Sequence, residues 1–92
     1  MSKDMRPHAD ITLDFPIMVD GVEVKALRMR RPKARDELKF MESKGSEGRR
    51  SLEMFADLCE MPLNTILDID AADLAKMAEQ LGKFKGQETP TT

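Results

Sequence analysis

The order of apolar and polar positions predicts a β-hairpin near the start of the chain. In residues 11–19 every second position is apolar, which is typical of a strand with one buried face. Asp20-Gly21 follows directly, and this dipeptide is a strong signal for a two-residue type I′ turn. The return strand is predicted over residues 22–30.

The expected strand pairing requires one irregularity. Pairing across the turn places Val19 opposite Val22 and Ile17 opposite Val24. Further from the turn the apolar positions slip by one residue, and a β-bulge near Lys25-Ala26 would restore the alternation. That bulge would bring two further apolar pairs together, Phe15 with Leu27 and Leu13 with Met29. Pro16 cannot donate a ladder hydrogen bond, so it marks an edge or a bulge.

Downstream of the hairpin, apolar residues recur at helical spacing. Helices are predicted over residues 33–44 and 49–60, followed by a short helical turn at 63–67. A last helix starts at the N-cap Asp70 and ends before Gly86, with Asp73 favoured by the helix dipole in its first turn. The apolar faces of the three longer helices comprise Ala34, Leu38 and Met41; Leu52, Phe55 and Cys59; and Leu74, Met77, Ala78, Leu81 and Phe84.

These elements predict an α+β fold: an N-terminal β-hairpin followed by three to four short α-helices packed as a small bundle. We expect a flexible arm at 1–10, a single domain at 11–86 and a disordered polar tail at 87–92. A lone hairpin is marginal in water, so the helices must cover its apolar face. The residues predicted to form the core are Phe15, Leu27, Met29, Leu52, Phe55 and Leu74.

Composition narrows the classes of function. The 92 residues carry a net charge of −2, which argues against a general nucleic-acid coat. Charge is nevertheless polarised, with 12 basic and 9 acidic residues in 1–50 against 3 and 8 in 51–92. Such a distribution favours head-to-tail self-association or a complementary partner, so a homo-oligomer is one expectation. Neither a signal peptide nor a membrane span is visible, so we expect a cytoplasmic protein.

No pattern typical of catalysis or metal binding is present. There is no phosphate-binding glycine loop, and the single cysteine, Cys59, is expected to be a small buried hydrophobe. His8 lacks ligand partners at suitable spacing. The acidic residues Asp68, Asp70 and Asp73 lack the glycine turn of a calcium loop, so helix capping explains them better. We therefore expect no enzyme, no cofactor and no metal.

Two features suggest a binding surface. The first is a basic run that includes Arg28, Arg30, Arg31 and Arg35, which could contact an acidic partner or phosphate or could simply be a solvated outer face. If the run binds a partner, reversing Arg30 and Arg31 to Glu should leave the fold intact and weaken partner binding. The second is the methionine content, eight in 92 residues, since thioethers suit adaptable apolar surfaces as well as ordinary cores. The predicted partner-binding residues are Arg28, Arg30, Arg31, Arg35, Met41, Met54 and Met77.

The order of these signals resembles the small tail assembly chaperones of Mu-like and P2-like bacteriophages. The resemblance extends over about residues 11–84. It rests on Ile11-Thr12-Leu13, Pro16-Ile17, Asp20-Gly21, Leu27 to Pro32, Arg35-Asp36, Leu58-Cys59, Pro62, and Leu67 to Leu74. The glycine-rich Gly45–Gly48 linker and the high methionine content depart from the pattern.

The resemblance implies a role in assembly rather than in catalysis. Proteins of this family bind the long tape-measure protein, keep it soluble and recruit tail-tube subunits in the host cytoplasm, and they are absent from the finished particle. Two alternatives stay open at this point. One is a small DNA-binding phage regulator that uses the Arg28–Arg35 run, and the other is a structural tail component that remains in the particle.

Overall fold

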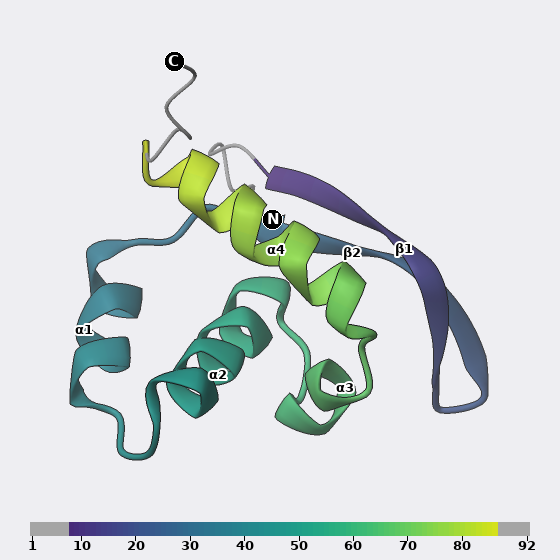
Figure 1. The fold of residues 1–92 in the computed structure, drawn as a ribbon, viewed down its shortest axis with the longest axis horizontal. Coiled ribbons are helices and arrows are strands. Elements are labelled where there is room, and N and C mark those ends of the chain that lie inside the picture. Colours follow the sequence, from purple (N-terminus) through teal and green to yellow (C-terminus); the bar gives the residue numbers. More distant parts are fainter. Residues whose placement is uncertain (1–7, 87–92) are drawn as a thin grey trace, which may run out of the picture.

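The fold is a two-stranded hairpin with helices laid along one side. The computed structural model describes residues 8–86 (Figure 1). The elements in these residues are β1 (His8–Val19), β2 (Val22–Arg30), α1 (Ala34–Glu42), α2 (Glu47–Cys59), α3 (Leu63–Leu67) and α4 (Ala71–Phe84). The α+β class and the order of hairpin and helices are confirmed.

The hairpin turn forms as predicted, but the first strand begins earlier. Asp20 and Gly21 have positive φ angles of 51° and 79°, as a type I′ turn requires. β1 starts at His8, so the last three residues of the predicted arm 1–10 belong to the strand. The remainder of that arm, residues 1–7, and the predicted tail 87–92 lie outside the described residues.

The irregularity in the hairpin lies in β1 and not in β2. The pairs beside the turn are those predicted, Val19 with Val22 and Ile17 with Val24. The next regular pair is Thr12 with Ala26, so four residues of β1 face one residue of β2. The irregularity is therefore at the predicted level, opposite Lys25, but the extra residues lie in β1 and not at Lys25-Ala26 as predicted. Pro16, predicted to mark an edge or a bulge, lies in this irregular segment. Leu27 and Met29 are instead paired with Ile11 and Ala9.

The displaced bulge also changes the core. Leu13 remains buried, whereas Phe15 is 56% exposed and does not belong to the core as predicted. Burial of Leu27, Met29 and Phe55 is confirmed, while Leu52 and Leu74 are only partly buried against the cluster. The buried apolar residues are Ile11, Leu13, Ile17, Leu27, Met29, Met54, Phe55, Ala56, Leu58, Cys59, Ile66, Ile69, Met77 and Phe84.

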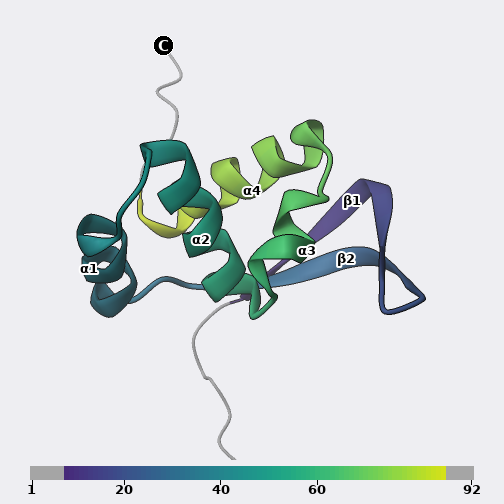
Figure 2. The same ribbon diagram turned by 90° about the horizontal axis from the view of Figure 1, so that it is seen from below.

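The two longest helices pack on different strands of the hairpin. α4 packs on β1, whereas α2 packs on β2 and also contacts α1 and α3. Figure 2 shows the helices on one side of the hairpin, with α1 at the end of the molecule away from the turn. Because α2 and α4 rest on different strands, each buries part of its apolar face on the hairpin and leaves the rest facing the other helix.

α1 lies in the opposite orientation to the one its apolar pattern predicts. Leu38 and Met41 are 51% and 65% exposed, and Ala34 on the same face is exposed too. The side of α1 turned to the protein carries Asp36, which is buried, and Phe40, which is half-buried. Polar contacts dominate this packing, so the apolar pattern alone points to the wrong face.

Candidate partner-binding groove

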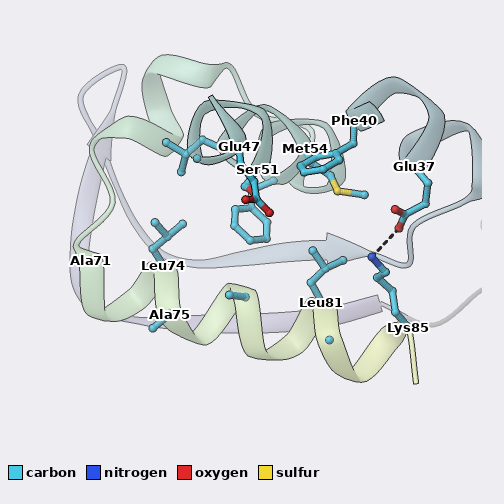
Figure 3. A pocket seen from close by; sticks show the side chains of 15 residues that line it. Glu37, Phe40, Glu47, Ser51, Met54, Ala71, Leu74, Ala75, Leu81 and Lys85 are labelled. Carbon is cyan, nitrogen blue, oxygen red and sulfur yellow. Dashed lines mark ion pairs between the residues drawn. The ribbon is translucent and has the colours of Figure 1, made fainter. Parts of the chain in front are cut away.

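An apolar groove of about 710 Å³ runs between α2 and α4, with α1 at one end. Figure 3 shows Leu74, Ala75 and Leu81 on α4, across the hollow from Ser51 and Met54 on α2. The lining residues share small or apolar side chains, with three charged groups at the margin. They are Glu37, Phe40, Glu47, Gly48, Ser51, Leu52, Met54, Phe55, Ala71, Leu74, Ala75, Ala78, Leu81, Gly82 and Lys85.

The groove exists because only part of the apolar face of α4 is buried in the core, while the rest faces α2. Met77 and Phe84 are buried in the core, while Leu74 and Leu81 are partly buried and face the groove. Small residues at Ala71, Ala75, Ala78 and Gly82 recur every three or four positions along the groove side of α4. Their lack of bulk leaves space between α4 and α2 that larger side chains would fill.

An ion pair closes the end of the groove nearest α1. Lys85 Nζ, just after α4, lies 3.0 Å from a carboxylate oxygen of Glu37 on α1. Both side chains are about one-third exposed, and the dashed line in Figure 3 marks the contact. A pair this exposed contributes little net stability. It links the margins of α1 and α4 without filling the apolar interior.

α1 is held in place by a partly buried bidentate ion pair. Arg30 at the end of β2 donates to both oxygens of Asp36, at 2.8 and 2.9 Å, and the Lys33 backbone N–H adds a third bond of 2.7 Å. The Arg30 guanidinium lowers the pKa of the Asp36 carboxyl, outweighing the burial that would raise it. The same contact raises the pKa of Arg30. The pair is therefore fully ionised at neutral pH.

Further contacts of α1 are with α2. Arg50 donates from Nη1 to the carbonyl of Phe40 at 3.2 Å and lies over the Phe40 ring, 4.9 Å from its centroid. Lys39 forms a 2.8 Å ion pair with Asp57. These polar anchors explain why the apolar side of α1 faces outward. They also place Phe40 at the closed end of the groove.

The Asp73 carboxylate positions α4 over the hairpin. Asp73 is fully buried. It accepts hydrogen bonds from the backbone N–H groups of Asp14 at 2.8 Å and Phe15 at 3.0 Å. Burial raises the pKa of the Asp73 carboxyl. The two hydrogen bonds and Lys76 lower this pKa by more than burial raises it, so the net shift is downward. Lys76 also donates to the Thr12 carbonyl at 3.0 Å. Asp73 and Lys76 of α4 thus supply hydrogen-bond partners to backbone groups in and beside the irregular part of β1.

The sequence-predicted basic residues do not form one surface. Arg28 is exposed with a long 3.5 Å contact to Asp10, and Arg35 is exposed on α1. Arg31 lies 5.7 Å from the centre of the Phe84 ring. Arg30 is committed to Asp36 inside the fold. Arg28 and Arg30 also line a smaller hollow of about 310 Å³ beside β2.

The three methionines singled out from the sequence have three different environments. Met41 is exposed on α1, Met54 is buried but lines the groove, and Met77 is fully buried in the core. Met77 in the folded state is therefore a packing residue and presents no surface. Phe40, Leu52, Ala78 and Leu81 line the groove, and sequence reasoning did not assign them to a site. The sequence signal for the groove was the row of small residues on α4, and that row is equally compatible with an ordinary helix that lines no groove.

Other candidate chemistry is weak. Cys59 is buried as predicted, and burial raises the pKa of its thiol to about 11. Within the described residues no three acidic, histidine or cysteine side chains gather in a way that could hold a metal ion. Between residues 8 and 86, no helix has the length and apolar content needed to cross a membrane. The groove between α2 and α4 has more than twice the volume of the hollow beside β2.

Comparison with known proteins supplies a family for this fold. The family described as "Phage tail assembly chaperone proteins, E, or 41 or 14" matches residues 10–86. No curated protein and no solved structure matches the chain. The match covers the hairpin from the third residue of β1 onward and every helix described above, including all groove-lining residues. The chain therefore belongs to the phage tail assembly chaperones.

Proposed function

We propose that this chain binds the tape-measure protein during tail assembly, keeps it soluble and brings tail-tube subunits to it. It does so without catalysis, in the host cytoplasm, and leaves before the particle is complete. The observation that carries the proposal is the apolar groove between α2 and α4. A tape-measure protein is long and helical, and an open apolar groove is the usual receptor for an amphipathic helix.

The dimensions of the groove fit this occupant. α4 has 14 residues, so its wall is about 21 Å long, which corresponds to roughly four turns of a bound helix. The Leu74 and Leu81 side chains are two turns apart on α4 and remain partly exposed. A helix with apolar residues at every third or fourth position could bury its apolar side against them. Many copies on one long chain would gain in total affinity through avidity.

The proposed contacts with tube subunits are made by exposed arginines that take no part in a buried ion pair. Arg28, Arg31 and Arg35 are exposed, whereas Arg30 is committed to Asp36. Arg31 also lies over the Phe84 ring, so Arg28 and Arg35 are the two proposed for this contact. They are suited to an acidic surface on a tube subunit, where rim charges mainly steer association. Reversing both to Glu should weaken tube binding and leave tape-measure binding unchanged, as measured with each partner separately.

Co-expression tests the main proposal. The chain is produced together with the long helical protein encoded nearest downstream, and the soluble fraction is purified by affinity. The expected result is a soluble complex with several copies of this chain on each long protein. Ala78→Glu puts a charge into the groove and should abolish the complex. Ala72→Glu is the matched control, because it makes the same change on an exposed face of α4 outside the groove.

Two results would overturn the proposal. In the first, the long protein stays insoluble in the presence of the wild-type chain. In the second, Ala78→Glu supports solubility as well as Ala72→Glu does. Circular dichroism of both variants shows whether each is folded, so a loss of binding can be separated from a loss of structure.

A further inference from the structure

The two strands of the hairpin differ in what covers their outer edges. A sheet of two strands has one outer edge on each strand, where backbone groups have no partner in the sheet. On β1 this edge is covered by α4, because Asp73 and Lys76 bond to backbone groups of residues 12–15. On β2, within residues 8–86, no hydrogen bond joins a backbone group to a residue outside the hairpin. The outer edge of β2 is therefore unpaired in the described fold.

β2 also lacks the features that usually keep an edge strand from pairing. Natural proteins blunt such edges with proline, with bulges or with an element that covers the edge. β1 has all three, in Pro16, the irregular segment and α4. β2 has neither a proline nor extra residues, and its nine residues extend over about 30 Å. A partner segment of similar length could pair along it.

The hollow of about 310 Å³ lies along this edge. Three consecutive residues of β2 line it, namely Ala26, Leu27 and Arg28. Because neighbouring side chains of a strand point to opposite faces, a hollow that all three line lies beside the strand and not over one face. Its other wall is formed by residues 58–61 at the end of α2. A further strand lies about 4.8 Å from its neighbour in a sheet, so the hollow provides space for one beside β2.

The charges along β2 favour one kind of partner segment. Residues 22–31 carry four basic side chains and one acidic side chain. Arg28 is exposed beside the hollow, and its contact with Asp10 is long and exposed. β2 of a second copy would bring the same excess of positive charge to this edge, and like charges placed opposite each other destabilise a sheet. An extended segment rich in aspartate or glutamate has the complementary charge.

We propose that an acidic, extended segment of a partner protein pairs with the outer edge of β2 as a third strand. Backbone hydrogen bonds beside residues 26–30 would supply affinity, and Arg28 would select for acidic side chains. Val22, which is 64% exposed, would be covered by an apolar residue of the same segment. The inference goes beyond the tape-measure complex, because no residue lines both this hollow and the groove. It rests on the proposed function only where the partner is a tube subunit.

A designed peptide tests the pairing. The probe is a peptide of about eight residues with blocked ends in which glutamate and valine alternate. The comparison peptide has lysine in place of glutamate. Amide hydrogen exchange of the chain is followed by NMR with each peptide. The glutamate peptide should slow exchange at every second residue of β2, because only these N–H groups point to the outer edge, and the lysine peptide should not.

N-methylation separates backbone pairing from attraction between charges. In an added strand, the N–H groups of every second residue face the neighbouring strand. One glutamate peptide is therefore methylated on each valine nitrogen, and another on each glutamate nitrogen. Only one of the two should lose its binding, because the other carries its methyl groups on the side turned away from β2.

Arg28→Glu tests the choice of an acidic segment. The variant should bind the glutamate peptide roughly 3–10-fold more weakly, because repulsion replaces one exposed charge contact. Lys44→Glu is the matched control, since Lys44 is exposed and does not line the hollow. It should bind the peptide as the wild type does. Circular dichroism shows whether both variants are folded.

Four results would overturn the proposal. The glutamate peptide could leave the exchange of β2 unchanged at millimolar concentration. The lysine peptide could bind as tightly as the glutamate peptide. Both methylated peptides could bind equally well, which would mean that charge alone acts. Exchange at β2 could slow when the chain is concentrated without peptide, which would assign this edge to a second copy.

The peptide experiment and the tube-binding experiment can fail separately. If the glutamate peptide does not pair with β2 while reversal of Arg28 and Arg35 weakens tube binding, only this inference falls. If the peptide pairs with β2 while that reversal leaves tube binding unchanged, only the proposed contact with tube subunits falls.

Discussion

The Asp73 carboxylate in the first turn of α4 accepts a 3.0 Å hydrogen bond from the backbone N–H of Phe15 in the irregular part of β1. A second bond, from the N–H of Asp14, is 2.8 Å long. The side chain of Phe15 meanwhile is largely exposed. β1 is therefore joined to α4 here through main-chain groups, and the Asp73 residue that accepts them is wholly buried.

Replacing Asp73 should destabilise the fold strongly. Asp73→Ala leaves two backbone N–H groups without their acceptor, and we expect the Tm to fall by roughly 5–15 °C. Asp73→Asn keeps the shape but turns one acceptor into a donor, so it should also lower the Tm. Thermal unfolding followed by circular dichroism measures both. Asp68→Asn, an exposed position in the same acidic cluster, is the control, and equal losses for Asp68 and Asp73 would contradict this role.

Arg30 should matter for stability more than its place in a basic run suggests. Arg30→Ala removes the bidentate partner of Asp36 and should cost about 1.5–3 kcal/mol in urea unfolding. Arg30→Lys keeps the charge but loses the paired geometry, so it should recover only part of this loss. Arg28→Ala, whose contact is exposed and long, should stay within about 0.5 kcal/mol of wild type.

The same contact changes what charge reversal would do. From the sequence, reversing Arg30 and Arg31 to Glu should leave the fold intact. With Asp36 buried beside position 30, a glutamate there would face a carboxylate it cannot pair with, so the double variant should unfold more easily. Reversal at Arg28 and Arg35 is the change that tests binding without this effect.

Stability should fall in acid because of two carboxylates. The folded pKa values of Asp36 and Asp73 both lie below the ordinary 3.8. Their contribution is therefore complete above about pH 5 and is lost as the pH falls below about 4, through the folded pKa values. Urea midpoints should be level from pH 7 to pH 5 and then decrease. The difference between wild type and Asp36→Asn should shrink at pH 3, and a constant difference would exclude this cause.

Leu13 and Phe15 belong to the same apolar alternation in β1, but only Leu13 is buried. Alanine substitutions at these two positions should therefore lower the free energy of unfolding by different amounts. Leu13→Ala should cost about 2–5 kcal/mol, because Leu13 is only 4% exposed. Phe15→Ala should cost under about 1 kcal/mol, since Asp73 binds the backbone N–H of that residue and not its ring. Urea unfolding measures both, and a larger loss at Phe15 than at Leu13 would contradict the observed register.

Local signals in the sequence were sufficient for the elements of this fold. The Asp20-Gly21 turn, the N-cap of α4 at Asp70 and the bounds of α3 each depend on neighbouring residues, and each is confirmed. Asp70 accepts from the Ala72 N–H at 2.8 Å, as a cap should. The earlier start of α2 follows from Ser46, whose hydroxyl accepts from the Arg49 N–H.

The features that sequence reasoning missed depend on partners far along the chain. The position of the bulge follows from Asp73, 58 residues after Phe15. The orientation of α1 follows from contacts that Arg30 and Arg50 make, which outweigh the pattern of Leu38 and Met41. The groove depends on the way α4 is rotated about its axis. An apolar pattern shows that a helix has a buried side, but it does not show how two helices share one hairpin.

The bond between Asp14 and Asp73 spans 59 positions, and this has a consequence for synthesis. At about 5–20 residues per second, a ribosome needs roughly 3–12 s to pass from Asp14 to Asp73. The hairpin can close only after Arg30 has been made. From then until Asp73 is added, for roughly 2–9 s at the same rate, its irregular segment has no acceptor for two N–H groups and α4 does not yet cover β1. The nascent hairpin thus cannot acquire these two hydrogen bonds before the last helix has been made.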